Sequence, residues 1–193
     1  MDLTDIFATF PPLETERCIL RAIAPEDAPD IFHIMSDARV THYLARLPMT
    51  SPEEAEKQVQ KYLTVYQEQE GIPWAIIRRG QKQVIGTCVF WNLIKAHFRA
   101  EIGYVLSPEW WGQGVITEVA SAMLTLGFTQ MGLHSVEAQM DPENTGSRRV
   151  LEKLGFAQEG YFRENYYDTV KEKFTDTAVF SLLRQTWMSR TEG

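Results

Sequence analysis

Hydrophobic and polar residues alternate in several short stretches of the chain, as in β-strands that bury one face. The first such stretch is TERCILRA, residues 15–22. Short connections join the three strands in the middle of the chain, which favours an antiparallel meander. The seven predicted strands are 15–22, 74–78, 83–93, 99–106, 135–140, 158–165 and 174–183.

Four other stretches carry apolar residues at helical spacing. The strongest start signal is Ser51-Pro-Glu-Glu54, which predicts a capping box with serine as the N-cap and proline at the first helical position. Gly71 and Gly155 are stop signals. The predicted helices are 25–35, 51–70, 115–131, and a fourth that follows the loop 141–146 and ends at Leu154.

The order of these elements predicts the fold class. A helix separates strand 99–106 from strand 135–140, so these two strands are expected to be parallel. We therefore expect a single α+β domain over residues 1–193, with a mixed, mostly antiparallel sheet and about four flanking helices. Residues 1–13 are expected to form a leader segment and residues 185–193 a C-terminal tail.

Composition narrows the function classes. The chain has 193 residues, of which 44% are hydrophobic, and a net charge of −7, so nucleic-acid binding is not expected. Cys18 and Cys88 are isolated and fit neither a metal-ligand spacing nor a disulfide framework. The N-terminus lacks the features of a signal peptide, and no apolar run is long enough to span a membrane. These features favour a cytoplasmic protein without a membrane partner.

A glycine turn between a predicted strand and a predicted helix is a candidate anion site. In Trp111-Gly-Gln-Gly114 the glycines permit a tight turn, and the helix start presents unpaired N–H groups. A P-loop is excluded because no lysine follows the last glycine, and a dinucleotide fingerprint fits poorly because the upstream strands form a meander. A coenzyme A pyrophosphate site remains, with a turn that binds no ligand as the alternative.

A second constellation lies at the start of the last predicted helix. Asn144 and Ser147 are one turn apart there and, taken alone, are read as simple helix caps. Together with other motifs they extend a longer pattern. The chain resembles the GNAT superfamily of acetyl-CoA-dependent N-acetyltransferases over about residues 15–184. Within it the resemblance is to the ribosomal-protein N-terminal (alanine/serine) acetyltransferases. It rests on Ala100–Pro108, Trp111–Gly114 with Thr117-Glu118, Asn144 with Ser147, and Glu152–Phe156.

The resemblance implies a sheet splayed into a V between the strands of Glu101 and Val136, with the pantetheine arm of acetyl-CoA in the cleft. Acetyl-CoA is then a co-substrate, and no metal is implied. Two departures stand out, because the family usually has Gly or Ala in place of Ile116 and often a catalytic tyrosine in place of Leu151. The implied coenzyme contacts are Val105, Leu106, Trp111, Gly112, Gln113, Gly114, Val115, Ile116, Thr117, Asn144 and Ser147.

The chemistry of amine acetylation assigns roles to further residues. A protonated amine must lose a proton before it attacks a thioester, so the site needs a base. Glu101 is the predicted base, on the strand face opposite Ile102; the alternatives are His97, His134, or a purely structural surface carboxylate at 101. Ser147 is the predicted acid for the departing thiolate. The alternative acids are Tyr161, Tyr166 and Tyr167.

The predicted function is acetyl transfer from acetyl-CoA to a primary amine, such as the N-terminal amine of a ribosomal protein. The acceptor pocket is expected between the loop 37–48, the capped helix and the loop 168–173. Three alternatives stay open: an acetyltransferase for a small amine or antibiotic, an acyl-CoA-binding regulatory module without turnover, and a nucleotide-binding protein unrelated to coenzyme A. Either a monomer or a homodimer is compatible with the sequence.

Overall fold

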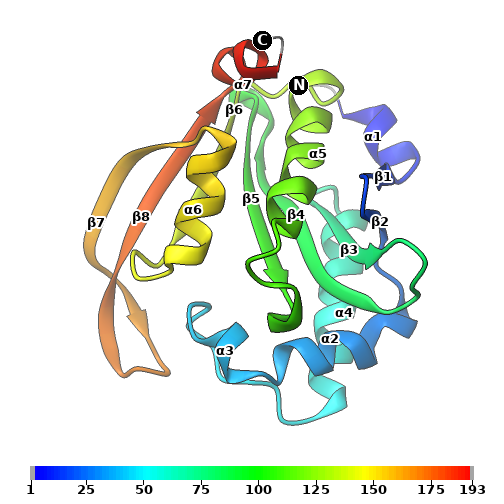
Figure 1. The fold of residues 1–193 in the computed structure, drawn as a ribbon, viewed down its shortest axis with the longest axis vertical. Helices are drawn as coiled ribbons and strands as arrows, with labels where there is room; N and C mark the ends of the chain where they lie inside the picture. Colours follow the sequence, from blue (N-terminus) through cyan, green and yellow to red (C-terminus); the bar gives the residue numbers. More distant parts are fainter. Residues whose placement is uncertain (1–2, 192–193) are drawn as a thin grey trace.

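The computed structural model describes residues 3–191, which form one eight-stranded sheet flanked by helices (Figure 1). The strand order is β1-β2-β3-β4-β5-β6-β8-β7. β5 and β6 are parallel, and the other neighbouring strands of the described chain are antiparallel, which confirms the predicted mixed α+β fold. The strands are β1 (Leu13–Glu14), β2 (Cys18–Ala22), β3 (Ile72–Arg78), β4 (Val84–Ile94), β5 (Arg99–Leu106), β6 (Ser135–Met140), β7 (Ala157–Asp168) and β8 (Lys173–Leu183).

Seven α-helices lie within residues 3–191, against about four expected. The four predicted helices are present as α2, α4, α5 and α6, whereas α1, α3 and α7 were not predicted. α1 and α3 have five and four residues, too few for a clear helical period, and α7 lies in the segment expected as a tail. The helices are α1 (Thr4–Ala8), α2 (Ala28–Met35), α3 (Ala38–Thr41), α4 (Pro52–Gln67), α5 (Val115–Thr129), α6 (Thr145–Leu154) and α7 (Arg184–Thr191).

The described parts of the expected leader and tail, residues 3–13 and 185–191, are folded against the rest of the chain. Leu3 and Ile6, in and beside α1, are buried in the main core. Trp187 of α7 is buried in the same core, with its ring 6.3 Å from that of Phe128. Both ends therefore contribute apolar surface to the fold.

Two hydrophobic cores cover opposite faces of the sheet. α5 and α6 pack on one face, and α2 and α4 on the other (Figure 1). Side chains that alternate along a strand enter different cores, so Ile76 belongs to the first and Ile77 to the second. This layering means that each residue of β5 faces either the α5–α6 side or the α2–α4 side.

The start of α4 differs from the predicted capping box. Ser51 is the N-cap, and Pro52 opens the helix as expected, but the serine side chain makes no capping hydrogen bond. The Glu54 carboxylate instead accepts hydrogen bonds from the backbone N–H and the hydroxyl of Thr50, at 3.1 and 2.8 Å. The acidic first turn thus binds the residue before the N-cap.

Cys18 and Cys88 are both buried and make no disulfide, as predicted. Burial raises the pKa of both thiols. Between residues 3 and 191, no helix is both long and apolar enough to cross a membrane.

Candidate active site

The parallel ladder between β5 and β6 is short and ends inside the sheet. It pairs Arg99 with Ser135, Ala100 with Val136, and Glu101 with Glu137. Beyond this last pair, β5 continues along β4 only, and β6 continues along β8 only. The two strands therefore part at Glu101 and Glu137, in the place where the V-shaped splay was expected. Their facing edges carry peptide groups that no longer belong to a β5–β6 ladder.

The glycine turn lies at the end of β5, just before α5. Gly112 and Gly114 have φ of +72° and +76°, a left-handed conformation that disfavours any residue with a Cβ. Gly112, Gln113 and Gly114 are exposed, and α5 begins directly after them at Val115. Val115 and Ile116 are buried in the core, so the bulk of Ile116 points away from the turn. The first N–H groups of α5 are consequently presented at an open helix N-terminus.

Arg17, which the sequence analysis did not single out, holds the glycine turn in place. The Arg17 guanidinium donates to the Gln113 carbonyl at 2.8 Å and pairs with the Glu118 carboxylate. The backbone N–H of Arg17 also donates to Glu118, at 2.8 Å. About a hundred residues separate Arg17 from these partners, so no local sequence pattern connects them. The contact braces the turn from the start of β2.

The remaining predicted coenzyme residues of this region have different environments. The Trp111 indole donates a hydrogen bond to the Leu106 carbonyl at 2.8 Å and so fixes the turn to the end of β5. The Leu106 side chain is buried in the main core, whereas Val105 packs against the core of α2 and α4. Thr117 lines a hollow of about 490 Å³ together with Gly114 and other residues of α5, α6 and α7.

Asn144 and Ser147 form the N-terminal cap of α6. The Asn144 side-chain oxygen accepts a hydrogen bond from the Ser147 N–H at 3.0 Å. The Ser147 hydroxyl is left for another partner, the Tyr104 hydroxyl at 2.9 Å. Burial raises the pKa of Tyr104 to about 12, although the Ser147 hydrogen bond opposes the rise. The capping interpretation is thus correct for Asn144, while Ser147 also makes a side-chain contact across to β5.

Tyr104 is a second residue that sequence reasoning missed, and the tyrosines named instead lie elsewhere. Tyr161, Tyr166 and Tyr167 are exposed on β7. Tyr161 donates a hydrogen bond to Asp176, and Tyr167 stacks edge-on against Phe174. Strand alternation could have found Tyr104, because it shares the face of Ile102, which packs toward α5 and α6. Leu151, at the position where the family often has a catalytic tyrosine, is fully buried and cannot donate a proton.

Glu101 is buried in the last rung before the strands part. Only 6% of the residue is exposed. Burial raises the pKa of its carboxyl to about 7, with a further contribution from the charge of Glu137 and an opposing hydrogen bond from Asn92. A carboxyl with this pKa changes protonation near neutral pH, as a general base for an amine requires.

Glu101 and Tyr104 lie on opposite faces of β5. Ile102 and Tyr104 belong to the α5–α6 side, whereas Glu101 and Val105 face the α2–α4 side. The predicted base and the predicted acid, Ser147, therefore approach the opening between β5 and β6 from two sides.

Comparison with known proteins assigns the chain to a family. The family model for the acetyltransferase (GNAT) domain matches residues 17–157. The chain belongs to the GNAT acetyltransferases. An uncharacterized N-acetyltransferase of Bacillus subtilis (strain 168), YoaA, is 41% identical over 175 residues, covering 91% of this chain and 98% of the relative. The crystal structure of a GNAT-family acetyltransferase from Bacillus anthracis is similar, with a TM-score of 0.80 at 28% identity, covering 91% of this chain and 99% of the other.

More distant GNAT relatives carry names that specify different acceptors. The spermidine N(1)-acetyltransferase of Vibrio cholerae is 23% identical over 173 residues, which is 90% of this chain and 96% of the relative. The [ribosomal protein uS5]-alanine N-acetyltransferase of Escherichia coli (strain K12) is 28% identical over 108 residues, or 55% of each chain. Membership of the family thus establishes N-acetyltransferase chemistry and leaves the acceptor open.

Two loops that are expected to shape the acceptor pocket, 37–48 and 168–173, contact each other in this GNAT fold. The Lys171 ammonium, in the β7–β8 loop, lies 5.9 Å from the centre of the Tyr43 ring, in the loop between α3 and α4. Lys171 also pairs with Asp141 at 3.1 Å and with Asp168 at 3.7 Å. These contacts join three loops that lie far apart in the sequence.

The two histidines considered as alternative bases lie away from the opening. His97 precedes β5 and His134 precedes β6, at the end of the sheet where these strands are still paired. Both are exposed. Within the described part of the chain, no group of three or more His, Cys, Asp or Glu side chains is arranged to hold a metal ion.

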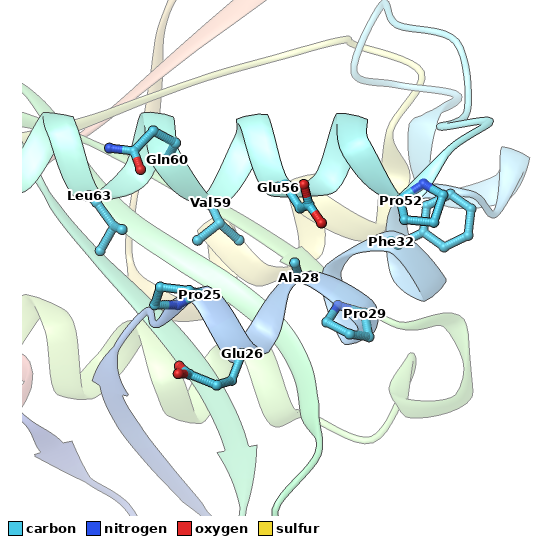
Figure 2. A pocket seen from close by; sticks show the side chains of 10 residues that line it. All are labelled: Pro25, Glu26, Ala28, Pro29, Phe32, Pro52, Glu56, Val59, Gln60 and Leu63. Atoms are coloured by element: carbon cyan, nitrogen blue, oxygen red, sulfur yellow. The ribbon is translucent and has the colours of Figure 1, made fainter.

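A larger hollow of about 620 Å³ lies between α2 and α4 (Figure 2). Pro29 and Phe32 line it from α2, and Val59 and Leu63 from α4, with Glu26 and Glu56 adding carboxylates. It contains none of the predicted coenzyme or catalytic residues. Its size alone therefore does not make it the reaction site.

Proposed function

We propose that this protein, as a single domain, transfers the acetyl group of acetyl-CoA to a primary amine, with Glu101 as the general base. One observation carries the proposal: the β5–β6 ladder stops at Glu101 and Glu137, which leaves a buried carboxyl beside an opening in the sheet. The family membership supports the acetyl donor.

Several features of the site fit acetyl-CoA. The exposed glycine turn and the free N–H groups at the start of α5 suit a pyrophosphate, and Arg17 places a cation beside them. The separated strands offer backbone donors and acceptors of the kind that the amide groups of a pantetheine arm require. Asn144 and Ser147 lie at the start of α6, and the Ser147 hydroxyl contacts Tyr104 on β5, beyond the point where β5 leaves β6.

The residues then divide the chemistry. Glu101 takes a proton from the amine nitrogen, whose lone pair forms a bond to the thioester carbonyl carbon. Backbone N–H groups of the splayed strands stabilise the oxyanion that develops. The carbon–sulfur bond breaks, and the Ser147–Tyr104 pair donates a proton to the departing sulfur. The products are an acetylated amine and the free thiol of CoA.

The acceptor we propose is a primary amine, either the N-terminus of a protein or a small amine. Names of relatives specify both kinds. The loops of Tyr43 and Lys171 meet, and Lys171 also pairs with Asp141, the residue that follows β6. These loops are the proposed walls of the acceptor pocket.

Thermal unfolding with acetyl-CoA tests the proposal first, with ATP and NADH as controls. A ligand at about 100 times its dissociation constant adds about 2.7 kcal/mol of stability, a readily measured shift. We expect a shift with acetyl-CoA alone, followed by acetylation of at least one member of a panel of N-terminal peptides, polyamines and amine antibiotics. Binding without any turnover would favour a regulatory acyl-CoA-binding module, and tighter binding of ATP would favour a nucleotide-binding protein.

A further inference from the structure

A row of side chains crosses the sheet at the point where β5 and β6 part. Trp91 of β4 pairs with Glu101 of β5, which pairs with Glu137 of β6, which pairs with Ser181 of β8. Directly paired residues in adjacent strands point to the same face of a sheet. Two carboxylates are therefore neighbours on the α2–α4 face, in the last rung before the opening.

The second carboxylate has a partner of its own. The Arg99 guanidinium forms a close ion pair with Glu137. Arg99 precedes Glu101 by two residues on β5 and so faces the same side. Its Nε atom is buried and, among the described residues, has no hydrogen-bond partner. The guanidinium therefore contacts Glu137 through a terminal nitrogen and not through Nε.

Glu101 has few polar neighbours. On β4 they are Trp91 and Asn92, the latter at a bulge with φ of +48°; on β6 the neighbour is Glu137; along β5 it is Arg99. Of the charged groups in the described chain, Glu137 is the one that contributes to the shifted pKa of Glu101, and neither α2 nor α4 adds another. The protonation of Glu101 therefore depends first on its burial and, among charged groups, on Glu137 and on what holds that carboxylate in place.

We infer that Glu137, held by Arg99, is a positioning residue that controls the proton affinity of Glu101. Glu137 is paired with Arg99 and accepts no proton from the substrate. Its negative charge disfavours ionised Glu101 and so makes Glu101 a stronger acceptor for the amine proton. The inference rests on the proposed role of Glu101 in acetyl transfer.

The Glu137→Gln variant tests this role through the pH profile. A base acts only when deprotonated, so kcat/KM falls as the pH drops through the pKa of Glu101. This fall is the acidic limb of the pH profile of kcat/KM. Without the neighbouring charge, we expect the acidic limb to move to lower pH by about 0.5–1 unit. Glu137→Asp keeps the charge and should leave the limb closer to that of the wild type. An acidic limb that stays in place in Glu137→Gln would overturn the inference.

The Arg99→Gln variant should move the acidic limb the other way. It leaves the Glu137 charge unneutralised, which raises the proton affinity of Glu101 further. Arg99→Lys, which keeps the positive charge, should restore the limb. A shift of Arg99→Gln in the same direction as Glu137→Gln would contradict the arrangement. Glu152→Gln, on the exposed side of α6, is the matched control and should change nothing.

Carboxyl ¹³C NMR separates this inference from the proposed function. The Glu101 resonance, assigned by its loss in Glu101→Gln, is titrated in the full-length wild type and in Glu137→Gln, with no acceptor present. A lower midpoint in Glu137→Gln supports the coupling even if Glu101 is not the base, in which case the activity profile would not follow the titration. An unchanged midpoint overturns the coupling whatever the activity shows.

Discussion

The Tyr104 hydroxyl lies 2.9 Å from the Ser147 hydroxyl, so β5 and α6 are joined across the opening on the side of the sheet away from Glu101. A strand residue and a helix residue 43 positions apart thus form one polar pair. In the proposed mechanism, this pair donates the proton to the departing sulfur, and Glu101 takes a proton from the amine on the other side of the sheet.

This pairing predicts a non-additive loss of activity. Ser147→Ala and Tyr104→Phe should each lower kcat by about 10- to 100-fold, because each breaks the same proton-donating pair. The double variant should lose little more than either single variant, since residues that act as a unit do not add. Steady-state kinetics with acetyl-CoA varied at saturating acceptor measures this. Independent losses that multiply would contradict a shared role, and Tyr161→Phe, on exposed β7, is the control.

The pKa of Glu101 predicts a specific pH dependence. With that pKa at about 7, kcat/KM of the wild type should fall about tenfold per pH unit at lower pH. Glu101→Gln should lower kcat by about 10²- to 10⁴-fold and lack this limb, while the dissociation constant of acetyl-CoA stays nearly unchanged. An identical profile in the variant would show that another group is the base.

The same carboxyl predicts an effect on stability. The folded state holds the pKa of Glu101 above that of the unfolded chain, so the protonated form is favoured on folding. The stabilisation is complete below the unfolded value and is lost as the pH rises through about 7. Glu101→Gln should therefore melt a few degrees, about 2–6 °C, above the wild type at pH 8 and show little gain at pH 4. A gain that is equal at both values of pH would contradict the assigned pKa.

Gly112 and Gly80 have nearly the same backbone conformation, so alanine substitutions at the two positions distinguish the effect of backbone strain from an effect on ligand binding. Gly112 and Gly80 have φ of +72° and +78°, and at both positions the space that a Cβ would occupy is clear of described atoms to 4 Å. Alanine at either position should cost about 1 kcal/mol of stability because of the left-handed backbone. Only Gly112→Ala should also weaken acetyl-CoA binding, since Gly80 lies in the β3–β4 turn. Calorimetric titration compares the two, and equal affinities would exclude the glycine turn as the phosphate site.

The contacts of Arg17 with the glycine turn predict that two arginine substitutions affect acetyl-CoA binding differently. Arg17→Met removes the contacts to Gln113 and Glu118 and should weaken acetyl-CoA binding about tenfold. Arg79→Met removes a similar set of side-chain contacts, to Glu14 and Thr15 rather than to Gln113 and Glu118, and should leave the affinity unchanged. Equal losses in both variants would indicate a general effect on the N-terminal strands.

Local pattern was sufficient for much of the fold. Alternation and helical spacing predicted the main strands and the four principal helices, and the helix between residues 106 and 135 predicted that β5 and β6 run parallel. The glycines at 112 and 114 marked the turn correctly because a left-handed backbone is a local requirement. Motif order, rather than any single residue, indicated the GNAT family.

The sequence by itself therefore determined the main strands, four of the helices, the parallel pair, the glycine turn and the family. Only the tertiary structure decided which side chains meet there: Tyr104 with Ser147, Arg17 with the turn, and Glu101 with Glu137 and Asn92. The reason is physical. Secondary structure follows from interactions between residues a few positions apart, whereas a hydrogen bond across the splay, or the burial that shifts a pKa, depends on residues that only folding brings together.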